Sequence, residues 1–328
     1  MPAPFAPSTT RDARGLGLLL GFFVVTLLLA AALAPPVYWW IHGWAAAESG
    51  GAAGTEPDGL AGYLAEKGFP RYFDRIRWLV ILAGVPWLCR ATGLTGRREL
   101  GLVGGREAWR VLALWLAAGL AMVAGITAGQ LASGSAVPRA PGASAIAEIL
   151  LLGLLAAALV AFFEELVFRG IVFRLAHRAL PAWGSVPAAA LIFALVHFLR
   201  VPSSAWPAGA PVPWWSGFAV AWRSLTALPQ TLDGAVFAGL VLAGAILCLI
   251  FLRHGTLLAP IGLHAGWVWG AQLHRRLVEV EAPSAAWGGR ALIDGAVPLG
   301  LLVLLLVGMV LAFRYSAAGL AGPGGRGR

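Results

Sequence analysis

The feature that most constrains the fold of this chain is a succession of long apolar runs. A helix needs roughly 20 apolar residues to cross the hydrocarbon core of a bilayer, and about eight segments approach that length. Only 12% of the residues are charged, against about 25% in soluble domains. We therefore predict an all-α, polytopic transmembrane helical bundle. The predicted spans are residues 15–41, 77–94, 108–130, 144–175, 182–199, 233–252, 256–274 and 296–314.

The first apolar segment resembles a signal peptide, because Arg11 and Arg14 precede its apolar run. That run is longer than the apolar part of a signal peptide, and Pro35 and Pro36 would directly follow the cleavage point. We therefore expect an uncleaved membrane anchor.

The distribution of charge predicts the topology. Arginines gather between spans two and three and after spans four, six and eight, whereas acidic residues lie in the alternate loops. Because cytoplasmic loops are enriched in Lys and Arg, we expect both termini on the cytoplasmic side of the cell (inner) membrane. The net charge of +9 then indicates contact with anionic lipid rather than with nucleic acid. The arginines behind this assignment are Arg90, Arg97, Arg98, Arg106, Arg174, Arg178, Arg253, Arg314, Arg326 and Arg328.

Three segments outside the spans have a distinctive composition. Residues 45–66 are rich in Gly, Ala and acids, which predicts a flexible loop. Residues 200–216 combine prolines with tryptophans, which predicts an interfacial loop or a lid rather than a helix. The tail from 319 to 328 predicts disorder.

The fourth span contains charges that a lipid-facing helix would not carry. In "FFEELVFRGIVF" (162–173), Glu164, Glu165 and Arg169 fall within six residues, and each charge at a helix centre costs about 2.5–3.5 kcal/mol on insertion scales. Glu165 and Arg169 are four residues apart, so they share a helix face and predict an ion pair. Glu164 points about 100° away and is available as a general base. The competing interpretation is a solvated charge cluster at a cytosolic helix end.

Two histidines lie in later spans. His197 occurs in "FALVHFLR" and His264 in "APIGLHAGWVWG". Either one alone is more often a packed structural residue. Polar residues in membrane spans face the bundle interior, so we expect both to meet the glutamates. One Glu with two His suits a hydrolytic zinc site, and it suits equally a metal-free site with a general base and an oxyanion partner.

These motifs resemble the CAAX protease and bacteriocin-processing family of intramembrane endopeptidases, also called the Abi family. The family pattern is EExxxR, then FxxxH, then HxxxN or HxxxD. Here Glu164-Glu165-Leu166-Val167-Phe168-Arg169 matches the first motif, and Phe193-Ala194-Leu195-Val196-His197 matches the second. His264 begins the third. The resemblance implies a helical catalytic core at 144–275, after an N-terminal transmembrane region at 1–143 and before a C-terminal span and basic tail at 276–328.

The resemblance also implies a reaction, hydrolysis of a peptide bond in a membrane-associated or lipidated peptide. Glu164 would activate water, with Glu165 and Arg169 orienting it. His197 would position the water or bind a metal, and His264 would bind a metal or stabilise the oxyanion. The family implies either a glutamate-dependent protease or a metalloprotease with zinc as cofactor, and in the latter Glu164, His197 and His264 would be the ligands.

Val268 departs from the family pattern, since it occupies the position of the Asn or Asp of the third motif. A valine cannot hold a water, a metal or an oxyanion. This favours, as an alternative, a catalytically impaired family member that acts as a membrane immunity or assembly factor. A proton-coupled transporter using Glu164 and His197 is a further alternative, although the chain lacks the internal repeats typical of many transporters.

Overall fold

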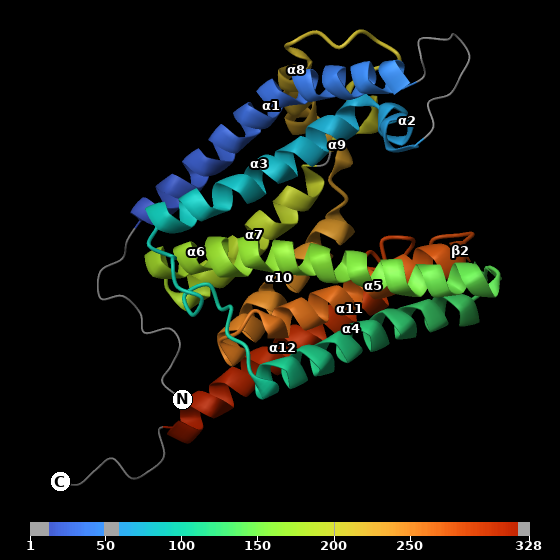
Figure 1. Ribbon diagram of the computed structural model, residues 1–328. Coiled ribbons are helices and arrows are strands. Elements are labelled where there is room, and N and C mark those ends of the chain that lie inside the picture. Colours follow the sequence, from blue (N-terminus) through green and yellow to red (C-terminus); the bar gives the residue numbers. More distant parts are fainter. Residues whose placement is uncertain (1–12, 49–58, 200, 321–328) are drawn as a thin grey trace. The chain divides into compact units, whose positions relative to one another are not determined.

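The computed structural model describes residues 13–48, 59–199 and 201–320, and these are predominantly helical, as predicted (Figure 1). The helices are α1 Arg14–Glu48, α2 Gly59–Ala65, α3 Phe69–Ala91, α4 Arg106–Ala132, α5 Ala143–Glu165, the π-helix η1 Leu166–Phe173, α6 Arg174–Ala179, α7 Ala182–Phe198, the 3₁₀ turn η2 Ser203–Ala205, α8 Ser216–Thr226, α9 Leu228–Thr231, α10 Gly234–His254, α11 Leu258–Leu277 and α12 Ala296–Leu320.

Each of the eight predicted spans is a helix, and the chain is a helical membrane protein. Within the described residues, five helices are long and apolar enough to cross a bilayer. The other three differ for local reasons, because α3 begins with several charged residues, α7 has only 17 residues, and α11 carries polar residues along its length. The five are Arg14–Glu48, Arg106–Ala132, Ser144–Ala179, Gly234–His254 and Ala296–Phe313.

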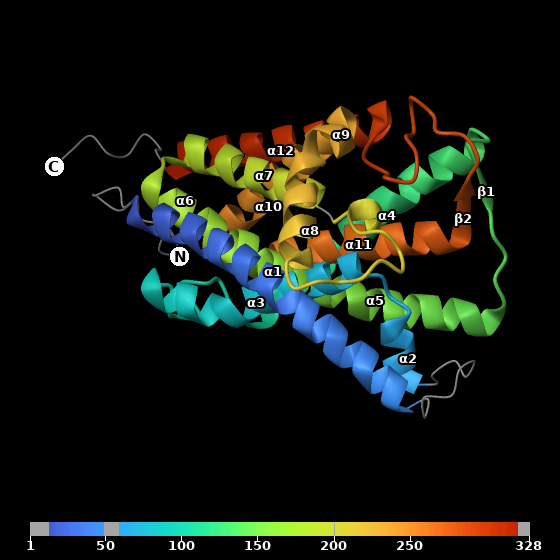
Figure 2. The ribbon, with the colours of Figure 1, turned by 90° about the horizontal axis from the view of Figure 1, so that it is seen from above.

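The helices form two compact units. The first comprises the described residues of Leu94–Ala194 and Asp233–Arg328, and the second comprises Arg14–Gly93 and Leu195–Leu232. In the first unit α11 lies between α4 and α5, and α12 packs on α10 (Figures 1 and 2). The boundary between the units falls within α7, after Ala194.

A ladder of glycines joins α11 to α4 in the first unit. Gly262, Gly266 and Gly270 recur every four residues and therefore share one face of α11. A Cβ at Gly262 or Gly266 would collide with a carbonyl oxygen of α4, and one at Gly270 would lie 2.8 Å from Cβ of Val123. Small residues at such spacing let membrane helices approach backbone to backbone. This contact fixes the position of α11 against α4, and His264 lies on another face of α11.

The second unit packs α1 against α3 and α8. Its core contains small residues of α1 and aromatic residues of α3, with Trp206 from the proline-rich segment buried among them. The indole of Trp39 donates a hydrogen bond to the carbonyl of Val212 at 2.8 Å, so this segment is attached to α1. As predicted, residues 201–215 contain no α-helix, only a short 3₁₀ turn.

Two details differ from the sequence-based expectation. A small antiparallel ribbon pairs β1 Ala136–Pro138 with β2 Val278–Val280; three-residue strands leave no periodicity from which to predict them. The loop expected at 45–66 is partly helical, because α1 continues to Glu48 and α2 begins at Gly59. The rest of that loop, 49–58, and most of the tail, 321–328, lie outside the described residues.

The glycine ladder predicts the effect of one added methyl group. Gly266→Ala should destabilise the protein by about 1–3 kcal/mol, because its Cβ meets the Leu116 carbonyl and the packed helices must separate. Gly125→Ala on α4 is the matched control, since nothing lies within 4 Å of its Cβ and alanine is the better helix former. Unfolding in mixed detergent micelles measures both. Equal stability of the two variants would contradict a close α4–α11 contact.

Candidate active site

Glu165 and Arg169 form the predicted ion pair, buried inside the first unit. Nη1 of Arg169 donates to Oε1 of Glu165 at 2.8 Å, and both side chains are almost completely buried. Nη2 of Arg169 donates to the carbonyl of Gly244 on α10 at 3.2 Å. The interpretation of a solvated charge cluster is therefore wrong for these two residues. Among the described residues, Oε2 of Glu165 and Nε of Arg169 have no hydrogen-bond partner, so the buried pair is only partly satisfied.

The helix changes type at the two glutamates. Glu164 and Glu165 are the last residues of α5, and Leu166–Phe173 continue as the π-helix η1, in which Val167–Phe173 are all buried. Short π-helical segments are frequent at functional sites. The sequence analysis missed this feature, and the apolar run of 166–173 has no residue that would distinguish a π-helix from an α-helix.

His264 of α11 is the second residue bound to Glu165. Its Nδ1 lies 2.7 Å from Oε1 of Glu165, and its Nε2 lies 3.8 Å from Oε2 of Glu164. Because Arg169 already donates to the same carboxylate oxygen, Glu165 is held as an anion and Nδ1 of His264 is the donor. The imidazole therefore directs Nε2 toward Glu164. The structure thus brings four of the five predicted site residues together, Glu164, Glu165, Arg169 and His264.

Phe193 of α7 completes the wall of this cluster. Its ring centre lies 4.5 Å from the guanidinium carbon of Arg169 and 6.1 Å from the ring of His264. α7 reaches this position because Gly244 has no side chain; a Cβ there would lie 3.0 Å from Cα of Ala190. The sequence analysis noted Phe193 only as part of a motif and missed Gly244, whose role depends on contacts between distant helices.

His197 and Val268 lie one helical turn beyond two members of the cluster. His197 follows Phe193 on α7, is partly buried, and belongs to the second unit. Val268 follows His264 on α11 and is also partly buried. Residues four apart share a helix face, so Val268 lies on the side of α11 that carries His264.

The cluster was also compared with the requirements of a metal centre. Across residues 13–48, 59–199 and 201–320, no group of three or more His, Cys, Asp or Glu side chains is arranged to hold an ion. Two donors suited to zinc, Nε2 of His264 and Oε2 of Glu164, do face each other. A carboxylate bonded to the other nitrogen of the histidine, as Glu165 is, commonly accompanies zinc ligands.

The fold and the buried Glu–Arg–His cluster define a polytopic helical membrane protein with a polar site inside its helices. Residues 146–270, which contain the whole cluster, match the family described as Type II CAAX prenyl endopeptidase Rce1-like. The resemblance found in the sequence is thereby confirmed for this segment. No curated protein and no solved structure matches the chain.

Breaking the buried ion pair should destabilise the protein strongly, and a second substitution should restore part of that stability. Arg169→Met should destabilise the protein by about 3–5 kcal/mol, because it leaves the Glu165 carboxylate buried without its cation. Adding Glu165→Gln to that variant should recover part of the loss, since the uncompensated charge is removed.

Arg110→Met is the control, because Arg110 pairs with Glu107 at 3.8 Å on an exposed surface and such pairs contribute little. Denaturant titration in mixed micelles measures all four proteins. Equal effects of Arg169→Met and Arg110→Met would contradict a buried pair.

Proposed function

We propose that the chain is an intramembrane endopeptidase in which Glu164 and His264 hold and activate a water molecule. The observation behind this proposal is the separation of 3.8 Å between Nε2 of His264 and Oε2 of Glu164. With Nδ1 donating to Glu165, a neutral His264 presents a lone pair at Nε2. Two acceptors at this distance favour a shared hydrogen donor, and a water molecule beside the line that joins them donates one hydrogen bond to each.

In the proposed reaction Glu164 acts as the general base. It removes a proton from the water while the water oxygen forms a bond to the scissile carbonyl carbon, which gives a tetrahedral oxyanion. Glu164 then returns the proton to the leaving amine as the C–N bond breaks, so that an acid and an amine are released. A positioned general base typically accelerates such a reaction 10²–10⁴-fold.

Glu165 and Arg169 are positioning residues in this proposal, because both act through His264. Their buried pair fixes the carboxylate, and the carboxylate fixes the tautomer and orientation of the imidazole. We assign His197, which follows Phe193 by one turn of α7, to the oxyanion or to a second contact with the water. This assignment rests on the motif and not on a measured distance.

A zinc-dependent version of the same site is a second candidate, supported by the carboxylate on Nδ1 of His264. Glu164 and His264 would hold the ion; His197 would be the third protein ligand on the motif alone, because the described residues contain no group of three arranged to hold an ion. When bound there, zinc would supply a Lewis acid that polarises the scissile carbonyl. The roles of Glu165 and Arg169 would be unchanged.

The depth of the site suggests where a substrate enters. Glu164 lies 21 residues beyond the start of α5, or about 31 Å at 1.5 Å per residue, which is about the thickness of the hydrocarbon core. His264 lies only six residues beyond the start of α11. The candidate span continues from α5 to Ala179, so the start of α11 is the better guide, and we propose that the site lies toward that membrane face, which is the cytoplasmic face in the predicted topology. A lipidated peptide anchored in that leaflet is the substrate class we propose.

Val268 supports a different candidate, a family member that binds membrane peptides without cleaving them. It lies one turn after His264, where the motif has an amide or carboxylate. Restoring that group tests the idea, because Val268→Asn should raise cleavage if the position limits activity. No change in either cleavage or binding would exclude Val268 as the limiting feature.

Glu164→Gln should reduce peptide cleavage by about 10²–10⁴-fold, because the amide cannot accept the proton of the water. Thermal stability should remain close to that of the wild type. Glu148→Gln, an exposed glutamate of the same helix, is the control and should leave cleavage unchanged. Proteoliposomes with a panel of lipidated peptides provide the assay, and cleavage by Glu164→Gln at the wild-type rate would contradict the proposed base.

Zinc binding separates the two versions of the site. Metal-stripped wild type and Glu148→Gln should take up one equivalent of zinc, and His264→Ala should not, because it lacks the imidazole ligand. Elemental analysis after dialysis measures the content independently of activity. Equal zinc in all three proteins, or none in the wild type, would exclude this metal site and leave the metal-free version.

A further inference from the structure

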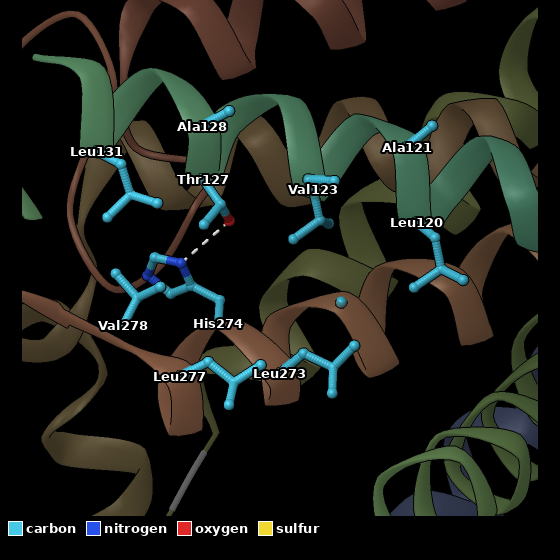
Figure 3. Close-up of a pocket in the computed structure, with 12 residues that line it drawn as sticks. Leu120, Ala121, Val123, Thr127, Ala128, Leu131, Leu273, His274, Leu277 and Val278 are labelled. Atoms are coloured by element: carbon cyan, nitrogen blue, oxygen red, sulfur yellow. Dashed lines mark hydrogen bonds between the residues drawn. The ribbon is translucent and has the colours of Figure 1, made fainter. Parts of the chain in front are cut away.

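An apolar groove outside the candidate active site lies between the second half of α4 and the end of α11 (Figure 3). Its volume is about 440 Å³, within the range of ligand pockets. The walls are aliphatic apart from two polar side chains, Thr127 and His274. The lining residues are Leu120, Ala121, Val123, Ala124, Thr127, Ala128, Leu131, Gly270, Leu273, His274, Leu277 and Val278.

The groove begins where the glycine ladder ends. Gly262, Gly266 and Gly270 hold α11 against α4, and the next residue at the same spacing is His274. An imidazole at this fourth position needs space that the glycines do not, so α4 and α11 cannot approach as closely there. His274 also bridges the two helices, because its Nδ1 lies 3.1 Å from the hydroxyl of Thr127 (Figure 3).

The other nitrogen of His274 has no hydrogen-bond partner among the described residues. The side chain is buried, with 3% of its surface exposed, and it lies beside Leu131 and Val278 in Figure 3. When the Thr127 hydroxyl donates to Nδ1, the ring proton is on Nε2, which then requires an acceptor. Buried polar groups nearly always find a partner, so in this tautomer the groove has one specific unmet donor.

The length and depth of the groove indicate what fills it. From Leu120 to Leu131 it spans 11 residues of α4, or about 16 Å, which is close to half of the roughly 30 Å hydrocarbon core. It therefore extends from the end of a membrane-spanning helix to the middle of the bilayer. His274, three residues before the end of α11, lies at the depth where the acyl esters of a phospholipid meet the headgroup region.

We propose that this groove binds one acyl chain of a membrane phospholipid, whose ester carbonyl accepts a hydrogen bond from Nε2 of His274. The chain lies along Ala121, Ala124 and Ala128, which are small and exposed. When the lipid binds, the Leu131 side chain moves away from His274 and exposes its imidazole. The groove selects a ligand whose apolar chain is about as long as one leaflet is thick and which carries an ester oxygen at the outer end of that chain.

An ester–ether comparison tests the hydrogen bond. Wild-type protein in micelles should retain one diester phosphatidylcholine in native mass spectrometry, and should retain the diether analogue, which lacks the carbonyls, several-fold less. His274→Leu should lower diester retention to the diether level. Equal retention of both lipids by the wild type, or an unchanged preference in His274→Leu, would overturn the proposed contact.

A second experiment tests the groove itself. Ala124→Trp should fill it and abolish retention of both lipids, whereas Leu304→Trp on the exposed face of α12 should not. In nanodiscs containing phosphatidylcholine with a photoreactive acyl chain, wild-type crosslinks should concentrate on α4 and α11. Crosslinks of equal density on α12, or full retention by Ala124→Trp, would contradict a bound acyl chain there, and the wild-type map requires no variant to fold.

Discussion

The rest of the site depends on one carboxylate oxygen, Oε1 of Glu165, which contacts both Arg169 and His264. Oε1 of Glu165 accepts from Arg169 and lies 2.7 Å from Nδ1 of His264, so three helical segments meet at a single atom. None of these groups could stay charged in an apolar interior alone. Together they form a hydrogen-bonded set in which Nε2 of His264 lies 3.8 Å from Oε2 of Glu164.

Glycines hold the helices around this atom in place, because the absence of a side chain lets neighbouring helices approach closely. Gly266 lets α11 rest on α4, and Gly244 lets α10 approach α7 while its carbonyl accepts from Arg169. The same ladder explains the lipid-facing groove, because its fourth position is His274 rather than glycine. The glycine face of α11 thus ends in His274 at the proposed lipid site, whereas His264, two residues from both Gly262 and Gly266, lies on a different face and contacts Glu165.

Much of this arrangement could be predicted from local pattern. Long apolar runs located the spans, and the spacing of Glu165 and Arg169 identified the pair, since both depend on residues near in sequence. The π-helix η1 and the bond from His264 to Glu165 could not be predicted in the same way, because they depend on how distant helices pack. The glycines of α11 were visible in the sequence, but their partner helix was not.

The central claim is that the Glu165 carboxylate fixes the imidazole of His264 with its proton on Nδ1. Nitrogen-15 solid-state NMR of the protein in bilayers reports the tautomer of each histidine, and the His264→Gln variant assigns the signal. The account predicts a protonated Nδ1 and an unprotonated Nε2 for His264, with the pattern lost in Glu165→Gln. A His264 protonated on Nε2 alone in the wild type would contradict it.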